Sequence, residues 1–176
     1  MYFISGNSGK IREVRDILGD IQTLDIDLIE IQEIDAKEVI CHKLQEASLV
    51  QKGEILIEDT SLYCEGLGDL PGPLIKWFLK SLSLNQLAQL VIQTGNCKAR
   101  AKTIFGYQSD QGERHYFAGE IEGKIVLPRG ENGFGWDSIF EVAQTGRTFA
   151  EMDLTEKQQY SMRQIALRKL KAALKS

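Results

Sequence analysis

Three acidic residues stand at the ends of two apolar stretches, where carboxylates can hold a metal ion. Glu30 closes the stretch LDIDLIE, and Glu58 and Asp59 follow EILI. Ligands gather where the strands of such sheets end, and Mg²⁺ is usually held by one or two carboxylates together with substrate phosphate. Because side chains alternate between the faces of a strand, we expect only one of Glu58 and Asp59 to face a given pocket unless the strand has already ended. The alternative is that these are solvated turn acids.

The segment SGNSGK, residues 5–10, is a candidate phosphate site. It lies between a short apolar stretch and a helical pattern, so its backbone N–H groups stand at a helix start, where the helix dipole favours an anion. Lys10 adds a full positive charge. The segment is not a Walker loop, because two residues separate Gly6 from Gly9 and Ile11 follows Lys10. The alternative, which the segment taken alone favours, is an ordinary strand-to-helix turn.

Two aromatic rings and a carboxylate share the short run GFGWD, residues 133–137. A base of any kind gains about 1–3 kcal/mol by stacking on an aromatic ring such as that of Phe134, so the choice of base must come from hydrogen bonds. The alternative is a glycine bend that carries two buried rings.

Basic residues gather at the start of the last helical pattern. The spacing of Ser161 and Gln164 fits a capping box, which would begin the helix at Ser161 and place Arg163 in its first turn, with Lys157 on the approach. A cation there opposes the helix dipole by about 0.3–1 kcal/mol unless an anion or a carbonyl-bearing ligand is present. The segment is therefore either a ligand contact or a solvated basic helix end.

No other catalytic or metal-binding pattern is indicated. The two histidines, His42 and His115, have no partner at metal spacing and no partners for a serine triad. Three cysteines, Cys41, Cys64 and Cys97, include no C-x-x-C pair, which argues against a disulfide framework or a zinc ribbon. A reducing compartment fits this usage.

Length and composition indicate one globular domain over residues 1–176, of which 43% are hydrophobic. The 21 basic and 25 acidic residues are interspersed, so a net charge of −4 offers no polybasic face to a nucleic acid polymer or a membrane. No apolar run reaches the length of a signal-peptide core or a membrane span. We therefore expect a cytoplasmic protein.

The hydrophobic patterns predict an α/β fold that begins strand, helix, strand, helix and continues with meandering strands. The expected strands cover residues 1–5, 24–30, 54–61, 98–108 and 113–127. The expected helices cover residues 9–19, 35–53, 73–82 and 83–95, and a last helix begins at Ser161. This order favours a mixed sheet.

Four separated segments together resemble the inosine triphosphate pyrophosphatase family. SGNSGKIREV is similar to the family's amino-terminal T/S-G-N-x-x-K turn, and IEDTSL followed by LGDLPGPLIKWF is similar to its acid strand and proline–glycine loop. LPRGENGFGWDSIF is similar to its F-G-W-D segment, and FAEMDLTEKQQYSMRQIAL to its terminal AEM…EK…SHR stretch. The segments follow the family's order over almost the whole chain, and LPGPLIKWF together with GFGWD is highly specific.

The resemblance implies an elongated mixed central β-sheet, flanked by helices that form two lobes with a cleft between them. It also implies a homodimer that requires Mg²⁺ and acts on nucleoside triphosphates. The implied reaction is the hydrolysis of non-canonical purine nucleoside triphosphates (ITP, dITP and XTP) to the monophosphate and pyrophosphate, which removes them from the nucleotide pool.

The resemblance also assigns site residues. Contacts with the phosphates are implied for Ser5, Gly6, Asn7, Lys10 and Lys76. Glu30 and Asp59 match the metal-associated acids, and Asp59 is the best candidate for activating the attacking water, so the implied catalytic set is Asp59, Lys10 and Glu30. The implied base pocket consists of Phe134, Gly135, Trp136 and Asp137, completed by Lys157 and Arg163.

One residue departs from the family pattern. Where the family usually has Ser-His-Arg, this chain has Met162 between Ser161 and Arg163, so a polar contact to the base is missing. Met162 either packs in the apolar stripe of its helix or alters the base preference, since a thioether can rest against a ring but cannot donate to it. The alternatives to the implied reaction are a pyrophosphatase retuned through Met162 to another modified nucleotide, and a catalytically silent nucleotide-binding protein.

Overall fold

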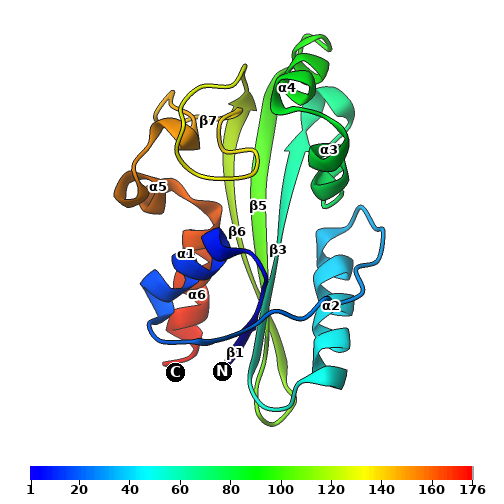
Figure 1. The fold of residues 1–176 in the computed structure, drawn as a ribbon, viewed down its shortest axis with the longest axis vertical. Coiled ribbons are helices and arrows are strands. Elements are labelled where there is room, and N and C mark those ends of the chain that lie inside the picture. The colour runs from blue at the N-terminus through cyan, green and yellow to red at the C-terminus, as the bar shows by residue number, and fades with distance from the viewer. Residues whose placement is uncertain (176) are drawn as a thin grey trace.

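A computed structural model describes residues 1–175 as a mixed α/β fold built on one elongated, twisted sheet (Figure 1). Its strands are β1 (Tyr2–Ile4), β2 (Gln22–Leu24), β3 (Ile55–Cys64), β4 (Pro71–Gly72), β5 (Lys98–Gln108), β6 (Arg114–Ile125) and β7 (Phe140–Val142). The α-helices are α1 (Ser8–Leu18), α2 (Ala36–Val50), α3 (Ile75–Ser81), α4 (Leu84–Ile92), α5 (Leu154–Tyr160) and α6 (Met162–Ala173). The predicted fold class is confirmed.

Three long antiparallel strands form the centre of the sheet, whose order is β2-β1-β3-β5-β6-β7, with β4 paired to β3 outside this path. β5 pairs with β3 from Gln108 opposite Ile55 to Ala99 opposite Cys64, and with β6 from Lys98 opposite Lys124 to Gln108 opposite Arg114. β1 is parallel to both β2 and β3. The predicted hairpin and the mixed character of the sheet are confirmed.

Helices cover the two faces of the lower half of the sheet (Figure 1). Leu56 and Phe105 pack against α1 and α6 on one face, and Ile57 and Ile104 pack against α2 on the other. These neighbours along β3 and β5 point to opposite faces because side chains alternate along a strand. The upper lobe has its own apolar cluster, which includes Leu87 of α4. In the described residues, no helix has the length and apolar character needed to cross a membrane.

The edge of β3 is left open in its middle. β1 pairs with β3 only at Ile55 and Leu56, and β4 pairs with it only at Leu62 and Tyr63. Among the described residues, none of the strands pairs with residues 57–61 on this side. Unpaired edge groups of a strand are accessible to other partners. The open stretch of β3 therefore gives access to its side chains and backbone from the side of the sheet.

The predicted strand over residues 24–30 is wrong beyond Leu24, where β2 ends. β1, the strand to which β2 pairs, ends at Ile4, so the chain after Leu24 has no strand beside it. Ile26 and Leu28 nevertheless pack on the apolar cluster under α2, while Asp25 and Asp27 are exposed. The alternating pattern therefore comes from an extended loop laid along the core, not from a sheet.

Ser161 caps α6 as predicted, but the predicted capping box does not form. The Ser161 hydroxyl accepts the N–H of Arg163 at 3.2 Å. The backbone N–H of Ser161 is donated to the carbonyl of Lys157 at 2.9 Å, because Ser161 also ends α5. No N–H of Ser161 is left for the side chain of Gln164, and in the described residues the buried amide nitrogen of Gln164 has no hydrogen-bond partner.

The start of α6 lies directly on β6. A Cβ atom at Gly119 of β6 would overlap the carbonyl oxygen of Met162 and stand 2.8 Å from the backbone nitrogen of Ala166. Both are backbone atoms, so neither can turn aside as a flexible side chain can. Only glycine lets α6 approach this closely. The approach fixes the position of the start of α6, and therefore of Arg163, which follows Met162.

We expect Gly119→Ala to lower the free energy of unfolding by roughly 1–3 kcal/mol, because overpacking against backbone forces α6 away from β6. Urea denaturation monitored by circular dichroism measures the change. The control is Gly106→Ala on β5, where the three atoms nearest to an added Cβ belong to the side chains of Ile57, Ile40 and Leu44, at 3.3–3.4 Å. Equal stability losses in the two variants would contradict the close approach at Gly119.

Candidate active site

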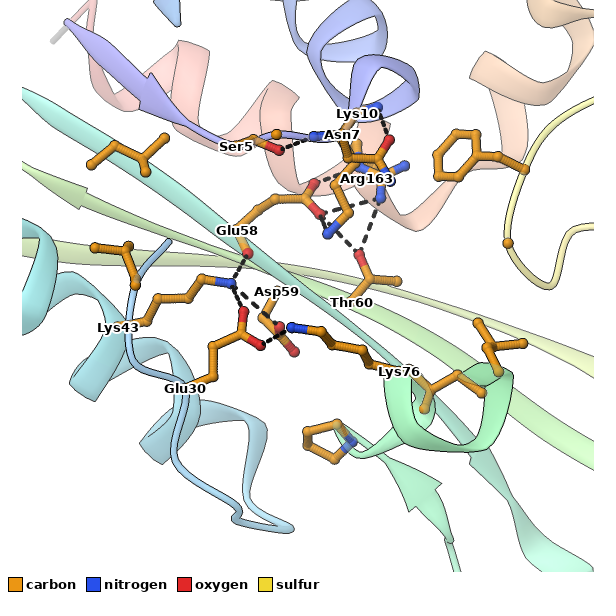
Figure 2. Close-up of a pocket in the computed structure, with 18 of the residues that line it drawn as sticks. Ser5, Asn7, Lys10, Glu30, Lys43, Glu58, Asp59, Thr60, Lys76 and Arg163 are labelled. Atoms are coloured by element: carbon orange, nitrogen blue, oxygen red, sulfur yellow. Dashed lines mark hydrogen bonds and ion pairs between the residues drawn. The ribbon is translucent and has the colours of Figure 1, made fainter. Parts of the chain in front are cut away.

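A cavity of about 740 Å³ lies at the open edge of β3, between the two lobes (Figure 2). Its wall is formed by the β1–α1 turn, the loop after β2, α2, the middle of β3, α3, the loop that contains Phe134 and the start of α6. Small-molecule sites usually occupy about 300–1,000 Å³, so the cavity has the volume of a ligand site.

The cavity collects nearly all of the site residues predicted from the sequence. Those that line it are Ser5, Gly6, Asn7, Lys10, Glu30, Asp59, Lys76, Phe134, Gly135, Trp136, Asp137, Met162 and Arg163. Lys157 is the exception: its side chain lies behind Asp137 and Phe134 and does not line the cavity. Phe134 and Asp59, which a single nucleotide would have to reach at once, stand on the same cavity.

Glu58 and Asp59 both line the cavity although β3 continues beyond them to Cys64. The prediction that only one of them could do so while the strand continued was wrong. Their side chains do leave opposite faces of β3, but the cavity wraps around the open edge and receives both (Figure 2). The two acids therefore have different neighbours.

Glu58 is held by cations on the α1 and α6 side of the sheet. Lys10 Nζ lies 2.6 Å from Glu58 Oε1, and Arg163 Nε donates to Oε2. Burial raises the pKa of the Glu58 carboxyl, but Arg163 and Lys10 outweigh it and hold the pKa well below its usual range. Glu58 is therefore ionised and its oxygens are occupied.

Glu30 is held by two lysines that come from different lobes. Lys43 Nζ of α2 lies 2.5 Å from Oε1, and Lys76 Nζ of α3 lies 3.0 Å from Oε2. Burial raises the pKa of Glu30, but Lys43 and Lys76 lower it from 4.5 to about 2. Lys43 Nζ also donates to the carbonyl of Glu58 at 3.4 Å, on the open edge of β3. Lys43 thus connects α2, the loop after β2 and the open edge.

Asp59 is the incompletely satisfied acid of the cavity. Its Oδ2 is buried without a hydrogen-bond partner, and its Oδ1 lies 3.9 Å from Lys43 Nζ. Burial raises its pKa from 3.8 to about 6, although Lys43 and Lys10 pull it down. A buried carboxylate oxygen without a donor is suited to a cation or to the proton of a water molecule.

The described residues contain no cluster of three or more His, Cys, Asp or Glu side chains arranged to hold a metal ion. Protein carboxylates alone are therefore insufficient for a closed metal site here. Glu30 and Asp59 offer the hard oxygen donors that Mg²⁺ prefers, and Mg²⁺ commonly takes one or two carboxylates together with substrate phosphates and water. The free Oδ2 of Asp59 fits such a shared site.

The loop around Phe134 is fixed from behind. Asp137 Oδ2 accepts the backbone N–H of Phe134 at 2.8 Å and contacts Lys157 Nζ at 2.7 Å. Gly133 and Gly135 adopt positive φ angles of 83° and 61°, which suits glycine and allows the tight bend. The Phe134 ring is half-buried and its face is turned to cations: Lys157 Nζ lies 4.7 Å from the ring centroid.

Trp136 has a structural role. It is 6% exposed and packs edge-on against Phe140 with ring centroids 5.5 Å apart, inside the apolar cluster of the upper lobe. Met162 belongs to the same cluster and is 3% exposed. Both residues touch the cavity, but packing accounts for Met162, which removes the reason to infer an altered base preference.

Arg163 is a fully buried cation at the start of α6, 2% exposed. Besides its contacts to Glu58, it donates from Nη1 to Glu13 Oε2 at 2.6 Å and from Nη2 to Thr60 Oγ1 at 3.1 Å. The cost expected from the helix dipole is therefore offset by two carboxylates. Of the five N–H groups of the guanidinium, one on Nη1 has no partner in the described contacts.

Sequence reasoning missed Glu13, Lys43 and Thr60. Glu13 follows Lys10 by three residues, so both lie on one face of α1, and this spacing is a signal that could have been used. Lys43 looks like any polar residue on an amphipathic helix, and only the tertiary structure turns it toward Glu30 and Asp59.

Comparisons with other proteins match this chain over nearly its whole length. The sequence model of the Ham1 family matches residues 1–173. A Schizosaccharomyces pombe protein named inosine triphosphate pyrophosphatase is 41% identical over 178 residues, which covers 99% of this chain and 94% of that protein. A Pyricularia oryzae protein of the same name is 44% identical and covers 97% and 90%. The structure of a HAM1 protein from Coxiella burnetii superposes with a TM-score of 0.80 at 25% identity, covering 99% and 98%.

The raised pKa of Asp59 predicts a specific pH dependence of stability. The folded-state pKa of Asp59, about 6, lies above the unfolded value of 3.8, so the folded state binds this proton more tightly than the unfolded state does. The stability that the proton contributes is therefore lost as the pH rises from the lower value to the higher one. We therefore expect Asp59→Asn to be more stable than the wild type at pH 7, by no more than about 3 kcal/mol, and nearly equal to it at pH 4. Urea denaturation at both pH values measures the difference. A difference that does not grow from pH 4 to pH 7 would contradict the raised pKa.

Proposed function

The chain belongs to the Ham1 family, and from this premise we propose that it is a nucleoside triphosphate pyrophosphatase that converts ITP, dITP and XTP to the monophosphate and pyrophosphate. The observation that carries the proposal is the shared cavity: a ring suited to base stacking and an unsatisfied buried acid line one space of about 740 Å³. The described residues act as one catalytic domain. Relatives that share more than 40% of this sequence bear the name of this activity, so the silent nucleotide-binding alternative is not favoured.

The β1–α1 turn and α1 are proposed to hold the phosphates. Asn7 Oδ1 caps α1 by accepting the N–H of Lys10 at 3.1 Å, which leaves the N–H groups of Ser8 and Gly9 without partners in the described contacts. Free N–H groups at a helix start and the Lys10 ammonium favour an anion there. Ser5 and Gly6 border the same space, and Lys76 faces it from α3. These residues bind and orient the triphosphate.

The charge of the cavity favours a phosphate that arrives with a cation. Its wall carries the cations Lys10, Lys43, Lys76, Lys80 and Arg163 and the acids Asp25, Asp27, Glu30, Glu58, Asp59 and Asp137. Because acids are at least as numerous as cations, the wall alone does not neutralise a triphosphate. Glu30 and Asp59 would hold Mg²⁺, which when bound supplies Lewis-acid stabilisation of charge on the phosphate oxygens.

Asp59 is proposed to activate the attacking water. Ionised Asp59 can accept a proton at Oδ2, which in the described residues has no other donor. The water then attacks the α-phosphorus, the bond between this phosphorus and the oxygen that bridges to the β-phosphorus breaks, and pyrophosphate leaves. Lys10 and Lys76 stabilise the negative charge that develops on the leaving group.

The base is proposed to stack on Phe134. Hydrogen-bond donors near the ring are the free N–H of Arg163 Nη1 and the backbone N–H groups of Gly135 and Trp136, which have no partner in the described contacts. These N–H groups can donate to a six-position carbonyl, as in hypoxanthine or xanthine. A six-position amino group leaves them unpaired, which disfavours adenine.

Two further parts of the proposal, a homodimer and a cytoplasmic location, rest on the resemblance in sequence and on the three free cysteines. A mass in solution equal to one chain would exclude the dimer.

We expect Asp59→Asn to lower kcat for ITP at least about 100-fold, because an amide cannot accept the proton. Pyrophosphate release with Mg²⁺ is measured across a panel of ITP, XTP, GTP and ATP, and chelation of divalent cations should abolish it. Asp20→Asn, at an exposed acid outside the cavity, is the control. Equal rates for the wild type and Asp59→Asn would rule out the proposed chemistry.

We expect Phe134→Ala to raise KM roughly 5- to 150-fold, by a similar factor for ITP and XTP, because stacking does not depend on the identity of the base. Phe134→Leu should recover part of the loss, since it keeps apolar contact with the α1 turn at Gly9. Steady-state kinetics measure both variants. An unchanged KM in Phe134→Ala would show that the base binds elsewhere.

A further inference from the structure

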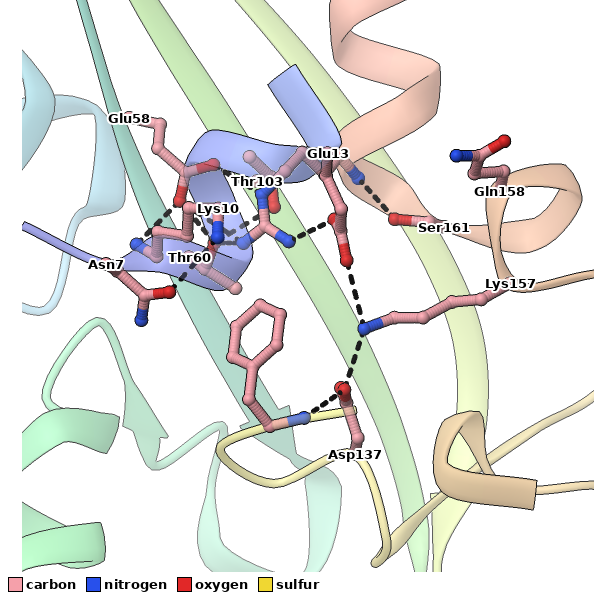
Figure 3. A network of polar contacts seen from close by, with 12 residues as sticks. Asn7, Lys10, Glu13, Glu58, Thr60, Thr103, Asp137, Lys157, Gln158 and Ser161 are labelled. Atoms are coloured by element: carbon pink, nitrogen blue, oxygen red, sulfur yellow. Dashed lines mark hydrogen bonds and ion pairs between the residues drawn. The ribbon is translucent and has the colours of Figure 1, made fainter. Parts of the chain in front are cut away.

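Glu13 of α1 is a buried acid that touches both sides of the proposed base site without lining the cavity (Figure 3). Its side chain is 2% exposed. Oε2 accepts from Arg163 Nη1 at 2.6 Å, and Oε1 lies 3.1 Å from Lys157 Nζ. Each oxygen thus faces a different cation, one on α6 and one on α5. The carboxylate fixes the spacing between these two cations.

The first set of contacts runs from Glu13 through Lys157 to the loop that carries the Phe134 ring. Lys157 Nζ contacts Asp137 Oδ2 at 2.7 Å, and the same oxygen accepts the backbone N–H of Phe134 at 2.8 Å. Figure 3 shows the chain of contacts from Glu13 through Lys157 and Asp137 to the loop. The position of Phe134 therefore depends on where Glu13 holds Lys157.

The second set of contacts holds Arg163, whose free N–H on Nη1 is the proposed donor to the base. Glu13 holds Nη1 of Arg163, while Glu58 and Thr60 hold Nε and Nη2. A planar guanidinium fixed at three nitrogens cannot rotate, so its one unpartnered N–H has a defined direction. Arg163 also lies under the ring, with its Cζ 5.7 Å from the Phe134 centroid.

We propose that Glu13 is a positioning residue that sets the discrimination between six-oxo and six-amino purines, by holding Arg163 and the Phe134 loop in a fixed relation. The inference rests on the proposed function. A donor discriminates between a carbonyl and an amino group only if it is held at the place where that group stands when the ring is stacked. Glu13 is the carboxylate that contacts both cations on which that relation depends.

A neutral side chain of the same shape cannot replace it. Glutamine presents one oxygen and one NH₂ group, and the NH₂ group is itself a donor. In Glu13→Gln, therefore, either Arg163 Nη1 faces a donor and loses its hydrogen-bond acceptor, or Lys157 Nζ faces a donor and loses its ion-pair partner. That cation keeps its other carboxylate, Glu58 for Arg163 or Asp137 for Lys157, but Glu13 no longer holds it in a fixed relation to the second cation.

The experiment compares kcat/KM for ITP and for ATP in the wild type and in Glu13→Gln. We expect the ITP-to-ATP ratio to fall roughly 10- to 100-fold, the scale of a lost hydrogen bond to a charged group. KM for ITP should rise by a larger factor than kcat falls, because the acids Asp59 and Glu30 do not contact Glu13. General loosening of the fold would instead lower activity on both nucleotides alike.

The matched control is Asp16→Asn. Asp16 lies on the same helix and also ties α1 to α5, since its Oδ2 accepts from Gln158 Nε2 at 2.9 Å, but it is exposed and outside the cavity. We expect its ITP-to-ATP ratio to equal that of the wild type. Glu13→Asp keeps the charge on a shorter side chain and should fold, with a ratio between those of the wild type and Glu13→Gln.

A wild-type ratio in Glu13→Gln, or an equal fall in Asp16→Asn, overturns the inference. If Glu13→Gln does not fold, Glu13→Asp decides: a lowered ratio supports the inference and an unchanged ratio overturns it. If the wild type itself releases no pyrophosphate from any nucleotide, the proposed function fails and the inference fails with it. An active wild type with an unaltered ratio in the variants removes the inference alone.

Discussion

The open middle of the β3 edge is the constraint on which the site depends. β1 is too short to reach it and β4 joins only beyond it, so residues 57–61 border a cavity where a neighbouring strand would otherwise lie. A closed sheet would separate the side chains of Glu58 and Asp59 by its full thickness. At an open edge, one ligand can contact both faces, and the two acids work from opposite sides of the same strand.

Pairing of buried charges then gives the two acids different tasks. Glu58 is surrounded by Lys10, Arg163 and Thr60, so its charge holds other groups in place. Asp59 retains an unsatisfied oxygen and a pKa of about 6, which costs stability but leaves an oxygen ready for a metal ion or a proton. Adjacent residues of one chemical type thus differ because burial and neighbouring cations differ.

Buried ion pairs also hold the Phe134 side of the cavity in place. The buried network alternates carboxylates with cations: Glu13, Glu58 and Asp137 contact Arg163 and Lys157, and both cations and Glu13 have two charged partners. These contacts connect α1, α5, α6, β3 and the Phe134 loop, which are far apart in the sequence. A hydrogen-bond donor can discriminate between two ligands only if the surrounding residues hold it in a fixed position.

The sequence by itself determined the hairpin of β5 and β6, the helices with clear caps and most of the residues that line the cavity, because these depend on local periodicity and on residue type. Prediction from the sequence was wrong where the outcome depends on contacts with other elements. Residues 25–30 alternate like a strand but have no strand beside them. Gln164 cannot complete a capping box because Ser161 donates its N–H to the carbonyl of Lys157 in α5. Only the tertiary structure could bring Lys43 to Glu30, place Lys157 behind the cavity wall and bury Arg163 between Glu13 and Glu58. Such contacts join residues up to 150 positions apart, and no local pattern encodes them.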